Sequence, residues 1–283
     1  MYTTLISTDD LARRLADPSL VIVDCRHNLS DVDAGEGAYR ASHLPGARFM
    51  HMDRDLSGEK TGKNGRHPLP DVASLSASLS RAGIDASKQV VAYDQNNAMW
   101  ASRLWWLLHW LGHEAAAVLD GGLDKWIAEG RPTTPDMPSI QPARFVAMHP
   151  RPVVSSADIL RHLSDRSSSP LTIVDARAAE RFRGDIEPLD PVAGHIPGAI
   201  NRPYGANLTR HGTFKPAELL RAEFEAQLGN APLSSVVHQC GSGVTACHNL
   251  LAMAVAAMPG SRLYPGSWSE WVADPTHPVA RGS

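Results

Sequence analysis

One cysteine, Cys240, stands where its chemistry could be used, between a short apolar run at 235–239 and a helical pattern at 244–258. Gly241 and Gly243 follow it and let successive backbone N–H groups turn toward one point, forming a concave anion site called a nest. The positive end of the following helix adds to this effect. We expect a thiol in that place to be largely thiolate at pH 7 and to act as a nucleophile.

Other kinds of site fit this loop less well. Its glycine spacing is similar to a dinucleotide fingerprint, but it does not open a βαβ unit and no acidic residue follows about 20 residues later. A phosphatase loop of the Cys-x5-Arg kind would need an arginine where Ala246 stands. Cys247 and His248 lie two helical turns beyond Cys240, too far to share one tetrahedral metal ion. We therefore expect no metal and no cofactor, and we expect Cys247 and Cys25 to pack in the core.

An internal repeat places the Cys240 loop in a larger fold. Four segments occur twice in the same order: 20–26 with 171–177, 43–47 with 195–199, 90–94 with 236–240, and 121–126 with 266–271. In each half, short β-branched runs alternate with helical patterns, and Ser7-x-x-Asp10 and Ser155-x-x-Asp158 predict capped helix starts. The sequence thus predicts an α/β fold of two tandem domains, each a mostly parallel sheet with helices on both faces.

The proline content marks the expected boundary between the halves. Six prolines within 131–152 exclude a helix or a central strand there and predict a semi-stiff linker. The domains are therefore expected at 1–130 and 153–283. Ligands of such parallel sheets collect at the carboxyl ends of the strands, and Cys240 stands at such an end.

Composition excludes several function classes. Among 283 residues, 43% are hydrophobic and 20% charged, as in a folded globular protein, and the formal net charge is −3. No basic run is present, so we expect no nucleic acid partner. The longest nearly apolar stretch, 250–258, falls short of the ~20 residues of a membrane helix, and residues 1–7 lack signal-peptide features. Three cysteines argue against a disulfide framework, and we expect a cytoplasmic protein.

The chain resembles the tandem-domain rhodanese-like sulfurtransferases, which include thiosulfate and 3-mercaptopyruvate sulfurtransferases. The resemblance covers nearly the whole chain and rests on the doubled fold, the paired Asp-x-Arg and His-x-Pro-Gly-Ala segments, the loop 240–246 and the segment 266–271. It implies that Cys240 takes a sulfane sulfur from a small anionic donor, becomes a persulfide, and passes the sulfur to a thiol, such as thioredoxin or glutathione, or to cyanide. A nest that stabilises a thiolate would also hold the outer sulfur of that persulfide.

The repeat separates structural residues from functional ones. Asp94 replaces Cys240 in the first half, and because a carboxylate cannot form a persulfide, the first domain is expected to be inactive. Residues present in both halves are expected to be structural, namely Asp24, Asp175, Arg26, Arg177, His43 and His195. Residues found in only one half are better candidates for the site.

Arg181 is such a residue, because Ser30 stands at its place in the first half. It matches the family arginine that binds the anionic end of the donor, a task that suits a forked guanidinium. Arg183 beside it is expected to be a solvated surface residue. The other expected substrate-binding residues belong to the loop: Gly241, Gly243, Val244 and Thr245.

Asp53, His67 and Ser242 look like a proton relay. Asp53 and His67 have no counterpart in the second half and match positions that approach the active loop from the other domain in mercaptopyruvate enzymes. Such a relay would protonate the enolate left after sulfur transfer, since histidine suits proton transfer near neutral pH. The alternative is hydrogen bonding within the loops, because the stretch 60–65 separates Asp53 from His67 and shifts the geometry.

The charged residues near Cys240 bear on which sulfur donor the resemblance implies. Thiosulfate enzymes of the family tend to carry Arg-Lys after the cysteine, whereas Gly-Ser here resembles the mercaptopyruvate form. Mercaptopyruvate enzymes also have a second arginine nine residues after the one matched by Arg181, and Asp190 stands there, with Arg202 or Arg210 as expected substitutes. A carboxylate facing the pocket would repel an anionic donor. The resemblance favours 3-mercaptopyruvate as the donor and leaves thiosulfate open. The alternative from another function class is a non-catalytic binding module.

Overall fold

The computed structural model describes residues 1–148, 150–165 and 170–283, and the chain divides into two units. Unit 1 comprises Met1–Gly58, Pro70–Arg151 and Thr209–Phe214; unit 2 comprises Glu59–Leu69, Pro152–Leu208 and Lys215–Ser283. The main division thus falls at the end of the proline-rich stretch 131–152. Two short segments, 59–69 and 209–214, cluster with the unit that the other half of the sequence builds.

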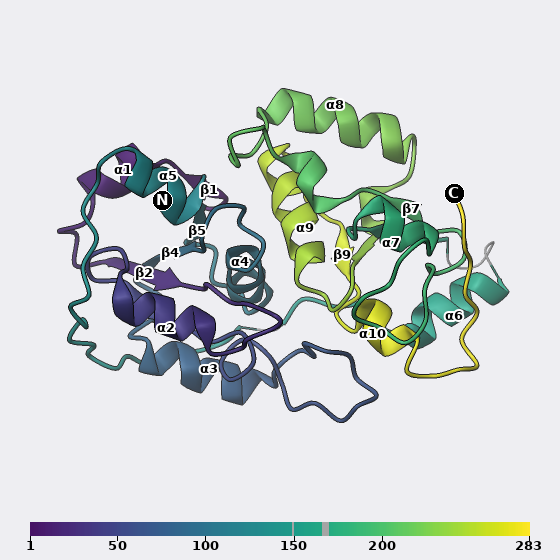
Figure 1. The fold of residues 1–283 in the computed structure, drawn as a ribbon, viewed down its shortest axis with the longest axis horizontal. Coiled ribbons are helices and arrows are strands. Elements are labelled where there is room, and N and C mark those ends of the chain that lie inside the picture. Colours follow the sequence, from purple (N-terminus) through teal and green to yellow (C-terminus); the bar gives the residue numbers. More distant parts are fainter. Residues whose placement is uncertain (149, 166–169) are drawn as a thin grey trace. The chain divides into compact units, whose positions relative to one another are not determined.

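Unit 1 is built on a parallel sheet with the strand order β1-β5-β4-β2-β3. Its strands are β1 (Leu5–Ile6), β2 (Leu20–Asp24), β3 (Arg48–Phe49), β4 (Gln89–Tyr93) and β5 (Ala116–Leu119). Its helices are α1 (Thr8–Arg13), α2 (Ala34–Ala41), α3 (Val72–Arg81), α4 (Ala101–Trp110) and α5 (Gly122–Ala128). Figure 1 shows α1 and α5 along one side of β2 and β4, and α3 along the other.

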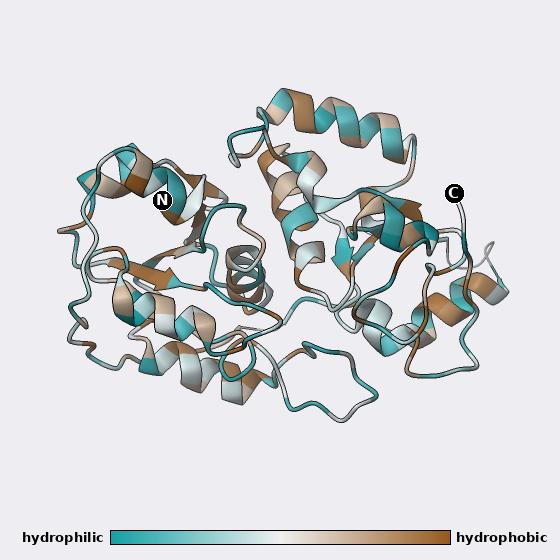
Figure 2. Cartoon of the chain, in the orientation of Figure 1, coloured by the Kyte–Doolittle hydropathy of each residue, from teal (hydrophilic) through white to brown (hydrophobic). Residues whose placement is uncertain are grey.

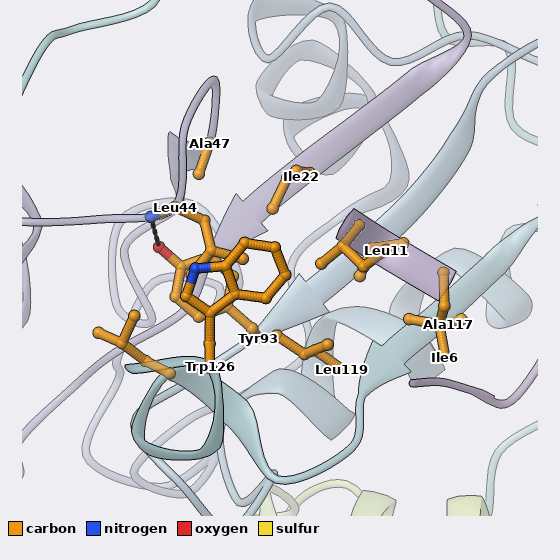
Figure 3. Close-up of a cluster of buried hydrophobic side chains, with 11 residues drawn as sticks. Ile6, Leu11, Ile22, Leu44, Ala47, Tyr93, Ala117, Leu119 and Trp126 are labelled. Carbon is orange, nitrogen blue, oxygen red and sulfur yellow. Dashed lines mark hydrogen bonds between the residues drawn. The ribbon is translucent and has the colours of Figure 1, made fainter. Parts of the chain in front are cut away.

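The core on one face of this sheet is drawn in Figure 3. Alternate residues of a strand point to the same face, so Ile22 of β2 and Leu119 of β5 pack in one cluster with Trp126 of α5. Trp126 has no exposed surface, and its indole N–H donates to the carbonyl oxygen of Pro132 at 2.8 Å. This cluster holds α5 to the sheet.

Unit 2 repeats the plan with a parallel sheet in the order β7-β6-β8-β9. Its strands are β6 (Thr172–Asp175), β7 (Ile200–Asn201), β8 (Val236–Gln239) and β9 (Arg262–Leu263). Its helices are α6 (Ser156–Ser164), α7 (Ala179–Arg183), α8 (Ala217–Leu228), α9 (Thr245–Val255) and α10 (Ser267–Trp271), with short 3-10 turns η1 (Tyr204–Asn207) and η2 (Leu233–Ser235). The predicted fold, parallel sheets flanked by helices in two tandem domains, is confirmed.

The helices of unit 2 lie on both faces of its sheet. Figure 1 shows α8 and α9 on one side of β9, and α6 and α10 on the other. Figure 2 shows hydrophobic and hydrophilic residues alternating along α8, whose buried residues Leu220, Phe224 and Leu228 recur at helical spacing. At the start of α6, Ser155 and Asp158 form the predicted capping box.

The repeated Asp-x-Arg segments form the same clamp in each unit. In both, Nη2 of the arginine lies 2.7 Å from a carboxylate oxygen of the aspartate and donates at 2.7 Å to the carbonyl just before the repeated histidine. The pairs are Asp24 with Arg26 and Asp175 with Arg177. Each pair is buried, and it fastens the end of a strand to the loop that leads into the next one. These contacts are structural in both units.

Replacing Trp126 with alanine is expected to lower the free energy of unfolding of unit 1 by about 3–5 kcal/mol, because the change leaves a cavity in a closely packed core. Its neighbour Ile127 is 50% exposed. Ile127→Ala should therefore change the free energy by no more than about 0.5 kcal/mol. Urea unfolding followed by circular dichroism measures both, and equal effects would contradict the core role of Trp126.

Candidate active site

Cys240 follows β8 and begins the loop that leads into α9. The N–H of Gly243 donates to its Sγ at 3.2 Å, and the Cys240 side chain is only 2% exposed. Gly243 has a φ of +77°, and a Cβ at this position would lie 2.3 Å from the carbonyl oxygen of Pro265, so the loop requires glycine here. This turn aims a main-chain dipole at the sulfur directly before the N-terminus of α9, where negative charge is favoured.

The loop is fastened to the start of α10. The N–H of Cys240 donates to Oγ of Ser267 at 3.1 Å, and its carbonyl oxygen accepts the N–H of Trp268 at 3.0 Å. The carbonyl oxygen of Gly241 accepts the N–H of Ser269 at 2.9 Å. These bonds explain why the segment 266–271 recurs with the loop in the sequence.

Segment 65–67 brings His67 to the same loop, within unit 2. Nδ1 of His67 lies 2.7 Å from Oγ of Ser242, and both side chains are buried. The segment approaches closely because Gly65, with a φ of +88°, lies where a Cβ would be 2.8 Å from the carbonyl oxygen of Gly266. The structure thus brings together two of the three residues of the predicted relay.

The remaining predicted residues divide between the units. Val244 is the N-cap residue of α9 and Thr245 its first residue, so both lie on the Cys240 loop. Asp53 belongs to unit 1, after β3, where its N–H donates to Nδ1 of His51 at 3.0 Å. The part of Asp53 in the relay stays a prediction.

Arg181, on α7, lies beside the loop as expected. Its Nη2 pairs with Oε1 of Glu187 at 2.6 Å and with Oδ2 of Asp190 at 3.3 Å, and the side chain is 16% exposed. Its Nη1 would lie 3.6 Å from a Cβ on Gly241. Arg183, by contrast, is exposed and pairs with Asp185.

The sequence analysis missed Arg66. Its Nη1 pairs with Oδ1 of Asp190 at 2.9 Å, and its Nη2 would lie 3.2 Å from a Cβ on Gly241. Asp190 is therefore held between Arg66 and Arg181 instead of presenting an uncompensated charge. The signal in the sequence was the position of Arg66 directly before His67, in a segment without a counterpart in the second half.

Neither expected substitute for the second arginine takes this place in unit 2. The guanidinium of Arg202 donates to Oδ1 of Asn207 at 3.0 Å and pairs with Glu223 at 2.8 Å. Arg210 belongs to the segment 209–214, which clusters with unit 1, and its Nε contacts His211.

Arg177 adds a positive charge near the sulfur. Burial acts against its charge, but Asp175, Glu187 and Cys240 raise the pKa of Arg177 above its ordinary value. Its guanidinium also lies 4.6 Å from the centre of the Trp268 ring. Arg177 thus places a positive charge near Cys240 besides forming its clamp.

The corresponding loop of unit 1 is filled by its own carboxylate. Asp94 accepts the N–H groups of Ala98 at 3.0 Å, Trp100 at 2.8 Å and Ala101 at 3.1 Å. Burial raises the pKa of Asp94, although these three N–H groups act in the opposite direction. The strand-to-helix loop of this fold thus holds an anion where the second half has Cys240.

Three features of the described ranges bear on other kinds of site. No three histidine, cysteine or acidic residues there are arranged to hold a metal ion. No helix there is long and apolar enough to cross a membrane. The three cysteines are thiols, and Cys25 and Cys247 are buried, which confirms their predicted core packing.

Comparison with known proteins identifies the family. A rhodanese-like domain model matches residues 7–129 and again 156–274. The chain belongs to the rhodanese-like family, with two such domains in tandem. It is 45% identical over 280 residues to a Pseudomonas aeruginosa protein named "Probable 3-mercaptopyruvate sulfurtransferase", covering 98% of each chain. It is 33% identical over 298 residues to thiosulfate sulfurtransferase of Cricetulus griseus, covering 100% of this chain and 97% of that one.

Solved structures agree with this assignment. The 3-mercaptopyruvate sulfurtransferase from Leishmania major superposes with a TM-score of 0.83 at 30% identity, covering 95% of this chain and 74% of that one. The resemblance to tandem rhodanese-like sulfurtransferases is therefore confirmed. The rhodanese-like matches include both loops described above, that of Asp94 and that of Cys240.

The rhodanese-like unit that carries Cys240 is expected to lose stability in acid through His238 of β8. Burial lowers the pKa of His238 to about 3, with a smaller contribution from Arg202, against an ordinary value of 6.5. Between these values the unfolded state binds the extra proton, so the free energy of unfolding should fall as pH drops below 6.5, by up to ~1.4 kcal/mol per pH unit.

Urea unfolding at pH 7, 6 and 5 measures this dependence. His238→Gln should reduce the slope below pH 6.5, whereas His211→Gln, at an exposed position, should keep it. A wild-type slope in His238→Gln would contradict the assignment.

Proposed function

We propose that this chain transfers a sulfane sulfur from 3-mercaptopyruvate to a thiol or to cyanide through a persulfide on Cys240. The observation that carries the proposal is the N–H of Gly243 directed at Sγ of Cys240 from 3.2 Å. Asp94, held by three N–H groups in the equivalent loop, supports the view that such a loop accommodates an anion. The names of the relatives support the choice of donor.

In the first half-reaction the Cys240 thiolate attacks the sulfur of the donor. The S–S bond forms as the C–S bond breaks, and the electron pair of that bond stays on carbon as the enolate of pyruvate. The former donor sulfur, now the outer sulfur of the persulfide, gives its proton to solvent and becomes an anion stabilised by the Gly243 N–H and the start of α9. Cys240 is oxidised and the donor carbon is reduced, so no other redox partner is needed.

The enolate needs a proton, and the Ser242–His67 pair can supply it. Oγ of Ser242 stands two residues after Cys240 and 2.7 Å from Nδ1 of His67, so a proton given up by the serine can be replaced from the ring. Thiosulfate would release sulfite, which leaves as a stable anion and requires no proton. The buried pair therefore favours 3-mercaptopyruvate, with thiosulfate as the second candidate because three of the relatives are named thiosulfate sulfurtransferase.

In the second half-reaction an acceptor nucleophile attacks the outer sulfur and releases the Cys240 thiolate. Thioredoxin, glutathione and cyanide each provide such a nucleophile. Three cysteines that are all thiols fit a reducing compartment, so we place the reaction in the cytoplasm.

Cys240→Ser is expected to abolish sulfur loading and to lower turnover at least about 1,000-fold, because serine cannot form a persulfide. Intact-protein mass spectrometry after exposure to 3-mercaptopyruvate detects the added sulfur, and a thiocyanate assay with cyanide measures turnover. Cys25→Ala, which removes another buried thiol, should keep both. Turnover persisting in Cys240→Ser would exclude the nucleophile, and no turnover of the wild type with either donor would favour a binding module.

Ser242→Ala and His67→Gln should each lower kcat with 3-mercaptopyruvate by about 10²–10⁴-fold, because the enolate loses its proton source. With thiosulfate the same variants should change kcat by less than about fivefold, since sulfite leaves without a proton. Asp53→Asn tests the third residue of the predicted relay by the same comparison of kcat with the two donors. Ser234→Ala, at an exposed position, is the control. Equal losses with both donors would contradict the relay.

A further inference from the structure

Backbone contacts fix Arg66 beside the Cys240 loop whatever its side chain does. The N–H of Arg66 donates to Oγ of Ser269 at 2.9 Å, and the N–H of Ser269 donates to the carbonyl oxygen of Gly241 at 2.9 Å. Only Ser269 thus separates the Arg66 backbone from the residue next to Cys240. Removing the Arg66 side chain leaves this chain of hydrogen bonds in place.

The guanidinium groups of Arg66 and Arg181 meet over Gly241. One nitrogen atom of Arg66 and two of Arg181 lie within 4 Å of the point where a Cβ of Gly241 would stand, and glycine leaves that point free. Two forked cations at one point match the two oxygens of a carboxylate. An anion bound there lies one residue from the reactive sulfur.

Arg66 also has an N–H group available for a hydrogen bond to a ligand. Its ion pair with Asp190 uses Nη1 and Nη2, while its Nε is buried without a hydrogen-bond partner among the residues that the structure describes. A buried N–H without an acceptor is unfavourable. A ligand oxygen over Gly241 would provide the acceptor.

The charges around this point cancel. Arg66 and Arg181 face Glu187 and Asp190, and both carboxylates are only 3% exposed. Such a cluster offers directed N–H groups but no net positive charge. A second negative charge on the ligand would add to the carboxylates and to the Cys240 thiolate in a place with little water, where Coulomb repulsion is strong.

We propose that Arg66 is the second donor-binding residue of this site, acting with Arg181, and that Asp190 tunes the pair to select a monoanionic 2-oxo acid over dianionic thiosulfate. Arg66 thus does from segment 59–69 what an arginine at position 190 would do. This inference rests on the proposed sulfur transfer from 3-mercaptopyruvate.

The test compares two donors that differ only in the anionic end. 3-Mercaptopyruvate and its neutral analogue 1-mercapto-2-propanone both give up sulfur to Cys240 and leave as an enolate, but only the first carries a carboxylate. Arg66→Ala should raise KM for 3-mercaptopyruvate roughly 10- to 100-fold, the range for one charged hydrogen-bonding partner. Its rate with the neutral donor should stay within about twofold of wild type.

Two further variants separate charge from fork geometry. Arg66→Lys keeps the charge but not the fork, so its KM should fall between wild type and Arg66→Ala. Asp190→Asn keeps Arg66 and removes a negative charge, so the ratio of kcat/KM for thiosulfate to that for 3-mercaptopyruvate should rise about 10-fold or more. Arg183→Ala, an exposed arginine on the same helix as Arg181, is the control and should leave both donors unchanged.

The outcomes are distinguishable. Equal losses with the charged and the neutral donor, or an unchanged KM in Arg66→Ala, would overturn the role of Arg66. An unchanged ratio of kcat/KM for thiosulfate to that for 3-mercaptopyruvate in Asp190→Asn would overturn the selection of monoanions. If Arg66→Ala does not fold, this ratio in Asp190→Asn is the deciding measurement. If the wild type never gains a sulfur by mass spectrometry with any donor, the proposed function itself fails.

Discussion

The site depends on one interaction, the N–H of Gly243 directed at Sγ of Cys240. Cys240 is 2% exposed, so the thiolate that the proposed reaction requires would lose most of its hydration, and buried charge must be compensated. Main-chain dipoles provide this compensation here, with Arg177 adding a longer-range charge. In the proposed reaction, a dipole would stabilise the anion without forming a tight ion pair at the sulfur, so the sulfur would stay available as a nucleophile. The geometry exists because glycine at 243 permits the turn and the close approach of Pro265.

The two halves show which part of this arrangement belongs to the fold and which to one residue. Both units have the parallel sheet, the Asp-x-Arg clamp and a strand-to-helix loop in which backbone N–H donates to the side chain at the strand end. In unit 1, the Asp94 carboxylate accepts three of these N–H groups from the loop. In unit 2, Cys240 leaves room for chemistry. The fold therefore provides an anion site, and the residue at the strand end decides its use.

The sequence predicts the short-range parts of this site and misses a long-range one. The residues of the Cys240 loop lie within a few positions of one another, and so do the aspartate and arginine of each clamp. Glycine positions and the repeat are therefore enough to identify them. The Ser242–His67 contact came from the family resemblance. Arg66 and Asp190 are 124 residues apart, and Asp190 considered alone suggests repulsion of an anionic donor. Only the clustering of segment 59–69 with unit 2 reveals that the two charges compensate each other.

Charge balance also bears on how two anions can react in turn at one place. After pyruvate leaves, the Arg66–Arg181 cluster with Glu187 and Asp190 returns to neutrality, so it neither retains the product strongly nor repels an incoming thiolate. In the proposed persulfide, the outer sulfur would lie about 2 Å beyond the buried Sγ. The acceptor therefore attacks an atom that lies further out than the cysteine sulfur itself. A strongly cationic pocket would bind the first anion more tightly but would also retain it, whereas compensated guanidiniums allow an anionic donor and an anionic acceptor to use the same entrance in succession.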